Sequence, residues 1–450
     1  MDLKERLVFF LVGLFLLQLF SVANANLVFP VERKFKGSVE NLAAIRDHDA
    51  QRRGRFLSAV DIPLGGNGRA NSNGLYFTKI GLGSPAKDYY VQVDTGSDIL
   101  WVNCVGCTTC PRKSGLGMDL TLYDPAQSTT STLVGCNDDF CTSTYNGPIS
   151  GCSKDMACPY SITYGDGSTT TGSYIKDYIT FNRANGDLKT VPDNSTVIFG
   201  CGAKQSGTLS SGSEESLDGI IGLGQSNASV LSQLAAAGKS TDYFRAHYNV
   251  NLKDLEVGGD SIQLPTDIFD LSSGREAIID SGTTLAYLPA TVYDQILEKV
   301  LAAQPGMKLY LVEEQFTCFR FDDNVDDGFP IVKFTFDEGL TLTTYPHDYL
   351  FLFKENMWCV GWQKSIAQSK DGQEIILLGD LVLSNKLVVY DLENMTIGWT
   401  DHNCSSSIKV KDDETGKVYA VSAHDLSSAS TVIIGSVLTL LMMLITMLNS

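Results

Sequence analysis

The chain has 450 residues, of which 43% are hydrophobic, enough for one large or two medium-sized hydrophobic cores. Its formal net charge of −18 at pH 7 argues against nucleic acid as a partner. The histidines are too scattered to predict a zinc site or a histidine-based catalytic triad; they are His48, His247, His347, His402 and His424. We therefore expect no metal and no cofactor.

The first 25 residues have the layout of a secretory signal peptide. Lys4 and Arg6 precede the apolar run 7–20, and a cleavage site of small residues follows at 23–25. The run is short for a membrane-spanning helix, so a cleaved signal is favoured over a permanent anchor. Cleavage is expected after Ala25.

Residues 26–69 form a basic region ahead of an acidic body. They hold eight Lys or Arg residues against five Asp or Glu residues. Because opposite charges attract, we predict a propeptide that lies across the body and is released when acid protonates the carboxylates. The cluster Arg52-Arg53-Gly54-Arg55 is a candidate processing site. A solvated, disordered linker is the alternative.

Two stretches of the body, 91–102 and 277–288, share one pattern. In each, an apolar strand ends at a tight turn of sequence Asp-[Ser/Thr]-Gly-[Ser/Thr], and a second apolar strand follows. The turns place one carboxylate each, Asp94 and Asp280, between strands that we expect to be buried. An Asp that only satisfies a turn is the ordinary alternative, but a second match in the same apolar frame argues against coincidence.

Paired carboxylates suit the hydrolysis of a peptide bond without a metal or a covalent intermediate. When two carboxylates share one proton, the ionised group activates water and the protonated group acts as the acid. Gly96 and Gly282 lack a Cβ and leave room for the two turns to meet. Hydroxyl groups able to fix the carboxylates by hydrogen bonds belong to Thr95, Ser97, Ser281 and Thr283.

The rest of the body is rich in strand patterns. Residues 75–83 and 88–93 alternate as a hairpin that leads into the first Asp turn. The stretches 216–224 and 374–383 form a second repeated pair, in which an apolar run with Gly follows each Asp turn. The two repeats predict an all-β fold of two pseudo-symmetric lobes.

Two segments are typical of helices. Residues 229–237 are rich in Leu and Ala and precede Gly238, which favours a helix end there. Residues 291–303 place apolar side chains on one face, and Thr291 is positioned to cap the N-terminus. Both helices are expected to pack on the lobes, and neither is assigned chemistry.

On these motifs the chain resembles pepsin-type aspartic proteases, and most closely the plant nepenthesin-like subgroup with a membrane-anchor tail. The resemblance runs from about residue 75 to residue 404. It implies a bilobal fold with a few short helices and an active-site cleft between the lobes. It also implies that Asp94 and Asp280 are the catalytic dyad, supported by Ser97 and Thr283. Such an enzyme cleaves extended polypeptides at acidic pH, and we expect a monomer.

Residues 160–172 alternate like a hairpin with a tip rich in Gly, Ser and Thr. Without the family, they would be read as a surface hairpin. The resemblance implies a flap that closes over bound peptide, with Tyr164, Gly165 and Asp166 at the substrate pocket and Trp101 bracing the tyrosine. Closure of such a lid expels water and strengthens the electrostatic interactions of the dyad.

The chain has eleven cysteines, and behind a signal peptide they predict disulfides. Eight of them resemble the cysteine-rich insert of the nepenthesin-like subgroup and are sufficient for four bridges of open connectivity: Cys104, Cys107, Cys110, Cys136, Cys141, Cys152, Cys158 and Cys201. The resemblance implies a bridge between Cys318 and Cys359 in the second lobe. Cys404 is then left without a partner.

One segment departs from the family pattern. Between Gly238 and the strand at 247–252, relatives typically carry a few tens of additional residues, with a cysteine and strands that cross between the lobes. This chain has only residues 239–246 there. The shortening removes sheet between the lobes and the expected partner of Cys404. Loss of a native disulfide commonly costs ~2 to 5 kcal/mol, so a splice or gene-model variant that folds poorly is one interpretation.

The C-terminal tail predicts attachment to a membrane. The polar stretch 405–430 ends in small residues, and the apolar run 431–448 almost reaches the end of the chain. Small residues before a terminal apolar tail without following basic residues are typical of a GPI-attachment signal. A transmembrane helix is the alternative, although about 18 residues barely span a bilayer. We expect an enzyme held by a GPI lipid anchor on the outer face of the plasma membrane.

The expected organisation is a signal peptide (1–25), a propeptide (26–69), an N-terminal lobe (70–239), a C-terminal lobe (240–404), a polar stalk (405–430) and the tail (431–450). Candidate glycosylation sequons begin at Asn194, Asn227, Asn394 and Asn403. Two alternatives to an active protease remain. One is a non-catalytic protease-like binding or inhibitor protein, and the other is an inactive isoform caused by the short segment.

Overall fold

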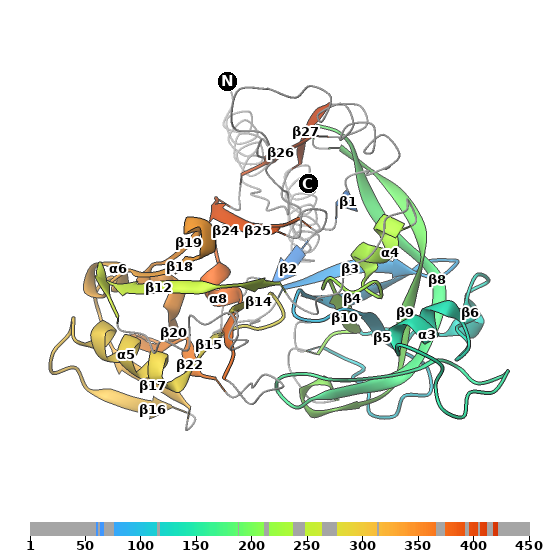
Figure 1. The fold of residues 1–450 in the computed structure, drawn as a ribbon, viewed down its shortest axis with the longest axis horizontal. Coiled ribbons are helices and arrows are strands. Elements are labelled where there is room, and N and C mark those ends of the chain that lie inside the picture. Colours follow the sequence, from blue (N-terminus) through green and yellow to red (C-terminus); the bar gives the residue numbers. More distant parts are fainter. Residues whose placement is uncertain are drawn as a thin grey trace, which may run out of the picture.

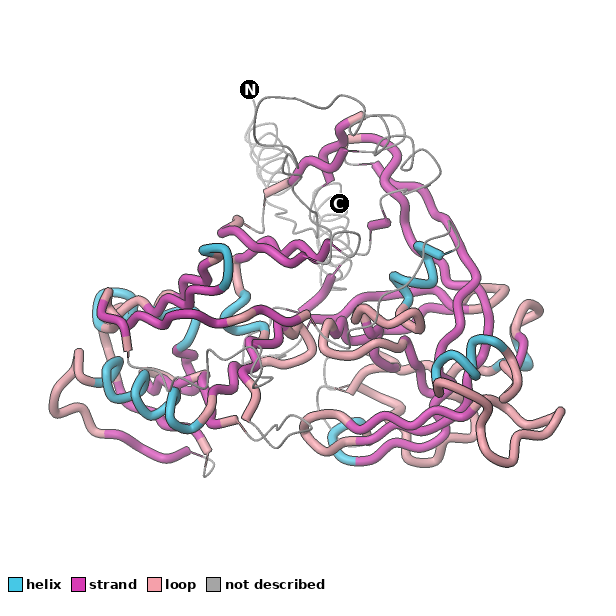
Figure 2. The backbone as a smooth tube through the Cα atoms, viewed as in Figure 1, coloured by secondary structure: helices cyan, strands magenta, loops and turns pink. Residues whose placement is uncertain are grey.

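The computed structural model describes residues 60–61, 64–66, 76–114, 118–187, 189–210, 216–236, 248–262, 277–312, 315–365, 374–391, 396–403, 406–411 and 417–421. The predicted signal peptide, the segment 239–246 and the tail 431–450 lie outside these residues, as do Gly238, Asn394 and Cys404. Strands dominate the described part of the chain and the helices are short (Figure 2). The predicted mostly-β fold of two lobes is confirmed.

The N-terminal lobe is built on a ten-stranded sheet, coloured blue to green in Figure 1. The strand order is β1-β8-β9-β5-β10-β4-β3-β2, and β6 and β7 pair with β8. The bounds are β1 Val60–Asp61, β2 Leu64–Gly66, β3 Tyr76–Leu82, β4 Lys87–Asp94, β5 Leu100–Asn103, β6 Thr132–Leu133, β7 Pro159–Thr163, β8 Thr169–Gly186, β9 Lys189–Ser206 and β10 Gly219–Gly222. The predicted first hairpin forms as β3 and β4.

The C-terminal lobe contains a five-stranded sheet, two four-stranded sheets and a two-stranded ribbon, coloured yellow to red in Figure 1. The five-stranded sheet has the order β11 (Asn249–Val250), β14 (Ala277–Ile279), β23 (Ile376–Leu378), β15 (Ala286–Leu288), β22 (Trp362–Lys364). The first four-stranded sheet has the order β13 (Asp260–Ser261), β12 (Leu252–Val257), β18 (Val332–Phe336), β19 (Thr341–Thr344). The second has the order β16 (Leu309–Val312), β17 (Phe316–Arg320), β21 (Met357–Val360), β20 (Leu350–Lys354). The ribbon pairs β24 (Lys386–Asp391) with β25 (Thr396–Asp401).

The same strand arrangement surrounds the Asp turn in both lobes. In the first lobe, β10 lies between β4 and β5, parallel to β4 and antiparallel to β5. In the second, β23 lies between β14 and β15, parallel to β14 and antiparallel to β15. These central strands are the predicted second repeat, and both are apolar and largely buried. The repeat therefore forms the two halves of a pseudo-symmetric centre.

The helices are short and pack on the lobes. Their bounds are α3 Asp139–Thr144, α4 Val230–Ala236, α5 Ala290–Leu301, α6 Val325–Gly328, α7 Pro346–Tyr349 and α8 Asp380–Leu383, with 3₁₀ turns at Pro125–Gln127, Gly207–Leu209 and Asp337–Gly339. Both predicted helices form, as α4 and α5. The predicted N-cap of α5 is wrong, because Pro289 is the cap and Thr291 lies inside the helix. The cap lies two residues earlier than predicted, and proline is tolerated there because the amide hydrogen that it lacks would have no partner within the helix.

Each lobe has its own hydrophobic core. In the first lobe, every residue of β5 is buried, with Leu100 and Val102 on one face and Trp101 on the other. In the second, α5 buries Val292, Ile296 and other residues of one face against the strands. The Asp turns are thus carried by strands that are fixed on both sides.

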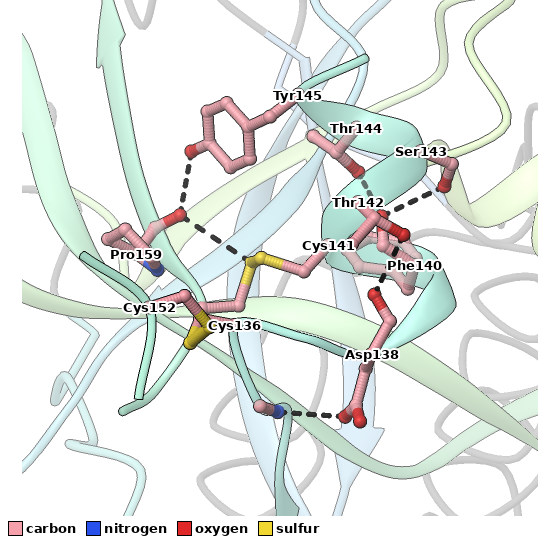
Figure 3. Close-up of a disulfide and its surroundings, with 12 residues drawn as sticks. Cys136, Asp138, Phe140, Cys141, Thr142, Ser143, Thr144, Tyr145, Cys152 and Pro159 are labelled. Atoms are coloured by element: carbon pink, nitrogen blue, oxygen red, sulfur yellow. Dashed lines mark hydrogen bonds between the residues drawn. A yellow bond between two sulfur atoms is a disulfide. The ribbon is translucent and has the colours of Figure 1, made fainter. Parts of the chain in front are cut away.

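Five disulfides are present among the described residues. They are Cys104–Cys201, Cys107–Cys110, Cys136–Cys152, Cys141–Cys158 and Cys318–Cys359. The bridge at Cys318 is the one that the resemblance implied, and the first four supply the connectivity that the sequence left open. Figure 3 shows Cys136–Cys152 beside α3, where the Tyr145 hydroxyl donates to the Pro159 carbonyl at 2.7 Å.

Strands also form near both ends of the described chain. Within the region assigned to the propeptide, β1 pairs with β8 and β2 pairs with β3. Within the region assigned to the polar stalk, β26 (Ile408–Lys411) and β27 (Val418–Val421) form a hairpin. It lies beside the β8–β9 hairpin (Figure 1), where the Ala420 amide donates to Asp187 at 2.8 Å. None of the described helices has the length and apolar character needed to cross a bilayer.

Candidate active site

The two Asp turns meet where the lobes face each other. Asp94 is the last residue of β4, and Asp280 directly follows β14. Both carboxyl groups are almost inaccessible, since the two residues are 5% and 7% exposed. The structure therefore brings together two carboxylates that are 186 positions apart in the sequence.

Each turn binds its own carboxylate in the same way. The Gly96 amide donates to Asp94 Oδ1 at 2.8 Å, and the Ser97 hydroxyl donates to Asp94 Oδ2. In the second turn, the Gly282 amide donates to Asp280 Oδ1 at 2.8 Å and the Thr283 hydroxyl donates to Oδ2 at 2.7 Å. Two donors hold each carboxylate in one orientation, which is the arrangement expected of a preorganised site.

The middle hydroxyls of the turns tie the lobes together. Thr95 Oγ1 donates to the Ile279 carbonyl at 3.2 Å and accepts from the Ser281 amide at 2.9 Å. Ser281 Oγ donates to the Val93 carbonyl at 3.2 Å and accepts from the Thr95 amide at 3.3 Å. These reciprocal bonds leave the two turns little freedom to move apart.

Glycine is required at the third position of both turns. A Cβ built on Gly96 would lie 2.5 Å from Asp280 Oδ1, and one on Gly282 would overlap Asp94 Oδ1. Each turn therefore presses its glycine against the opposite carboxylate. The close approach expected from the absence of a Cβ is present in the structure.

Electrostatics favour one shared proton at this site. Burial raises the pKa of the Asp94 carboxyl, and the negative charge of Asp280 raises it further, to about 8. The hydrogen bonds from Ser97 and Gly96 act in the opposite direction but are weaker. Because two such close carboxylates do not both ionise, the pair holds one proton over a wide range of pH.

The hairpin predicted to be the flap forms as β7 and the start of β8. Tyr164 lies at the end of this hairpin, and its hydroxyl accepts a hydrogen bond from Trp101 Nε1 at 2.7 Å. Gly165 and Asp166 are exposed at the tip. Asp166 accepts hydrogen bonds from the hydroxyls of Ser168 and Thr208, each at 2.6 Å, so the tip is fastened to the N-terminal lobe.

We predict that Trp101→Phe lowers kcat/KM for an unfolded protein substrate by ~3- to 10-fold at about pH 4. Phenylalanine keeps an aromatic ring but donates no hydrogen bond, and one such bond contributes about 0.5 to 1.5 kcal/mol. Tyr164→Phe removes the other partner and should cost a similar factor. If the two losses simply multiply in the double variant, the bond between these side chains does not position the flap.

Several residues at this site were not predicted from the sequence. Asp380, at the start of α8, is 2% exposed, and its amide donates to the Thr283 carbonyl at 2.8 Å. Burial, together with the charges of Asp280 and Asp94, raises the pKa of its carboxyl well above the ordinary value. Tyr248 of the second lobe donates to the Leu223 carbonyl of the first at 2.7 Å. Asp380 lies inside the repeated run 374–383 and Tyr248 lies in the predicted strand 247–252, but neither position signalled these contacts.

The other predicted sites lie on the surface or outside the described residues. Asn194, Asn227 and Asn403 are exposed, which glycosylation requires, while Asn394 and the unpaired candidate Cys404 are not described. Among the residues that the structure describes, no group of three His, Cys, Asp or Glu side chains is placed to hold a metal ion.

Comparison with known proteins identifies the family. Residues 76–247 match the family model described as xylanase inhibitor N-terminal, and residues 247–401 match the one described as xylanase inhibitor C-terminal. The chain is 49% identical to aspartic proteinase 36 and 47% identical to aspartic proteinase 39, both of Arabidopsis thaliana. These alignments cover 95% of both chains in the first case and 99% of both in the second.

More distant relatives agree with this result. Aspartic proteinase nepenthesin-2 of Nepenthes gracilis is 27% identical over 74% of this chain and 79% of its own. The crystal structure of edgp has the same fold, with a TM-score of 0.58 at 17% identity over 78% of this chain and 98% of that one. Together with the two buried Asp turns, the matches to the two family models and to aspartic proteinases 36 and 39 show that the chain belongs to the pepsin-like aspartic proteinase family of plants.

Proposed function

We propose that this chain is an aspartic endopeptidase that hydrolyses extended polypeptides at acidic pH. The observation that carries the proposal is the pair of carboxylates, Asp94 and Asp280, each held by two donors and each in contact with the glycine of the opposite turn. A site with these properties has one proton to give and one carboxylate to receive a proton.

In the proposed reaction, a water molecule bound between the carboxylates loses a proton to the ionised group while its oxygen attacks the peptide carbonyl carbon. The protonated group donates its proton to the carbonyl oxygen, giving a tetrahedral diol. Collapse of the diol breaks the C–N bond, and the leaving nitrogen takes up the proton that the base had received. As the C=O bond reforms, one diol hydroxyl returns its proton to the carboxylate that had acted as the acid. The dyad returns to its starting state with one shared proton.

We further propose that the enzyme is secreted, monomeric and held at the cell surface by a GPI anchor, with residues 26–69 as its propeptide. Five disulfides support passage through an oxidising compartment. The signal peptide and GPI signal rest on sequence pattern alone. Their direct test is release of the protein from membranes by a phospholipase that cleaves GPI anchors.

A non-catalytic binding protein is the second candidate, because the matching family models carry the description of a xylanase inhibitor. An inactive isoform is the third. The alignment with aspartic proteinase 39 spans 479 positions against the 450 residues of this chain, so that relative has at least 29 residues with no counterpart here. The intact Asp turns favour the protease over the binding protein.

The deciding experiment is an assay of secreted, oxidised protein on an unfolded protein substrate at about pH 4, with an Asp94→Asn chain as the blank. Cleavage by the parent and none by the blank is the expected result. A well-folded parent without activity would transfer the assignment to the binding protein. A parent that is neither secreted nor folded would identify the shortened segment as a folding defect.

A further inference from the structure

Gln92 makes a contact between the lobes that breaks their pseudo-symmetry. It lies on β4, two residues before Asp94, and its side-chain Nε2 donates to the Gly282 carbonyl of the second Asp turn at 3.0 Å. The equivalent position in the other lobe, 186 residues on, is Ile278. The two positions have the same place in their sheets, since Gln92 pairs with Ile220 of β10 and Ile278 pairs with Leu377 of β23.

The surrounding bonds make this asymmetry informative. The other hydrogen bonds that hold the two carboxylates and join the two turns each have a counterpart in the opposite lobe. These are the bonds from the glycine amides, the bonds from Ser97 and Thr283, and the reciprocal bonds made by Thr95 and Ser281. An isoleucine side chain has no donor, so the carbonyl of Gly96 receives no such bond from Ile278. One turn is thus tethered to the opposite lobe by a side-chain amide from the neighbouring strand, and the other is not.

The tether acts on a glycine that packs directly against Asp94. Gly282 donates its own amide to Asp280 and faces Asp94 at a distance that leaves no room for a Cβ. The Gly282 amide orients the Asp280 carboxylate, and the Gly282 Cα limits how closely the Asp94 carboxylate can approach. A hydrogen bond to the Gly282 carbonyl therefore fixes one end of a turn that positions both carboxylates. A small shift of Gly282 away from the first lobe would widen the gap between the carboxylates.

We propose that Gln92 is a positioning residue that holds the second Asp turn against the first lobe and so sets the separation of the two carboxylates. This inference rests on the proposed peptidase function. Gln92 takes no proton and touches neither carboxylate in the described contacts. Its effect is on the coupling between Asp94 and Asp280, which weakens as their charges move apart.

Two substitutions of similar size test the tether. Gln92→Leu has no donor at any pH, and kcat is expected to fall ~3- to 10-fold with KM changed less than twofold, because one hydrogen bond that holds the catalytic geometry is lost. The two limbs of its pH–rate profile should also move closer together, since weaker coupling brings the two apparent pKa values of the dyad closer.

Gln92→Glu supplies a signature that a packing role would not give. Its protonated carboxyl donates to the Gly282 carbonyl in acid, whereas the ionised form repels that carbonyl. Activity should be close to that of the parent near pH 3 and fall earlier than the parent's as pH rises. The other carboxyls that interact electrostatically at this junction are Asp94, Asp280 and Asp380. If Gln92 had no tether role, the ionised Glu would only add negative charge beside them, which favours the shared proton and would extend activity to higher pH.

Ile278→Val is the matched control, since it alters the equivalent strand position without any interlobe bond, and its pH profile should equal that of the parent. The inference is overturned if Gln92→Leu keeps the parent profile, or if Gln92→Glu and Gln92→Leu behave alike at every pH. A parent that is inactive while Asp94→Asn is equally inactive refutes the proposed function instead. The two failures are therefore distinguishable in one set of assays.

Discussion

Gly282→Ala is expected to reduce peptidase activity at least ~100-fold, because misplacing a catalytic group by about 1 Å commonly costs that much. The new methyl group would overlap Asp94 Oδ1, and it would lie 3.0 Å from Asp280 Oδ1. Neither neighbour is the free end of a flexible surface chain, since both carboxylates are buried and held by two donors each. The carboxylates must separate, and the shared proton is lost with their contact.

Gly398→Ala is the matched control for this substitution. Gly398 lies on β25, and a Cβ placed there meets no atom within 4 Å. Both variants should be secreted and show the disulfides of the parent, and kcat/KM on an unfolded protein at about pH 4 should fall only for Gly282→Ala. Retention of more than a tenth of the parent activity by Gly282→Ala would show that the turns do not need their close approach.

The sequence predicted those features that are local or repeated. The Asp turns, the two apolar runs that became β10 and β23, and the flap hairpin each carry their own pattern of apolar residues and turn residues. Their duplication also predicted two lobes. The roles assigned to Tyr164 and Trp101 needed the family resemblance, because a surface hairpin and a buried tryptophan have no pattern that joins them.

Contacts between the lobes were beyond the sequence. Gln92 alternates on β4 like any half-buried residue, and nothing in the chain places Gly282 beside it until both lobes are folded. The same holds for Tyr248 and its bond to the Leu223 carbonyl. The sequence places Asp380 only inside the apolar run 374–383. Its burial beside the dyad depends on the packing of α8 against the second turn.

The strands near the ends of the described chain, β1, β2, β26 and β27, were not predicted from the sequence. Residues 60–66 are short and contain Pro63 and two glycines, and residues 406–421 are mostly polar, so neither stretch has a local pattern strong enough to predict a strand. The partner of β1 and the hairpin end bound by Ala420 are distant in sequence, whereas β2 pairs with β3, the next strand along the chain. Pairing with a preformed edge supplies the order that the local pattern does not.

The folded protein is expected to lose at least ~3 kcal/mol of stability between pH 4 and pH 8, because one pKa unit corresponds to about 1.4 kcal/mol. Burial raises the pKa of the Asp218 carboxyl to about 7, although it accepts bonds from the Tyr90 and Thr121 amides. Burial also raises the pKa of Asp94 to about 8 and that of Asp380 well above its usual range. All three groups prefer their protonated form in the folded state.

The fall in stability with rising pH follows from the linkage between proton binding and folding. In the unfolded chain these carboxyls titrate near pH 4, so the folded state binds more protons between that pH and the folded-state pKa values. The stabilising contribution is complete below pH 4 and is lost as the pH rises through about 7 to 8. Denaturant unfolding followed by fluorescence at several pH values measures the loss, and a stability that rises over this range would contradict it.

Asp380→Asn isolates one of these groups. The amide stays neutral at every pH, so the variant should match the parent near pH 4 and be more stable than the parent at pH 8. Asp380 suits this test because its Oδ2 has no hydrogen-bond partner in the described structure, so few bonds are lost with the carboxylate. Asp155→Asn, at an exposed turn, is the control and should follow the parent throughout. Equal loss of stability in the parent and in Asp380→Asn would mean that Asp380 is ionised in the folded protein across the whole range.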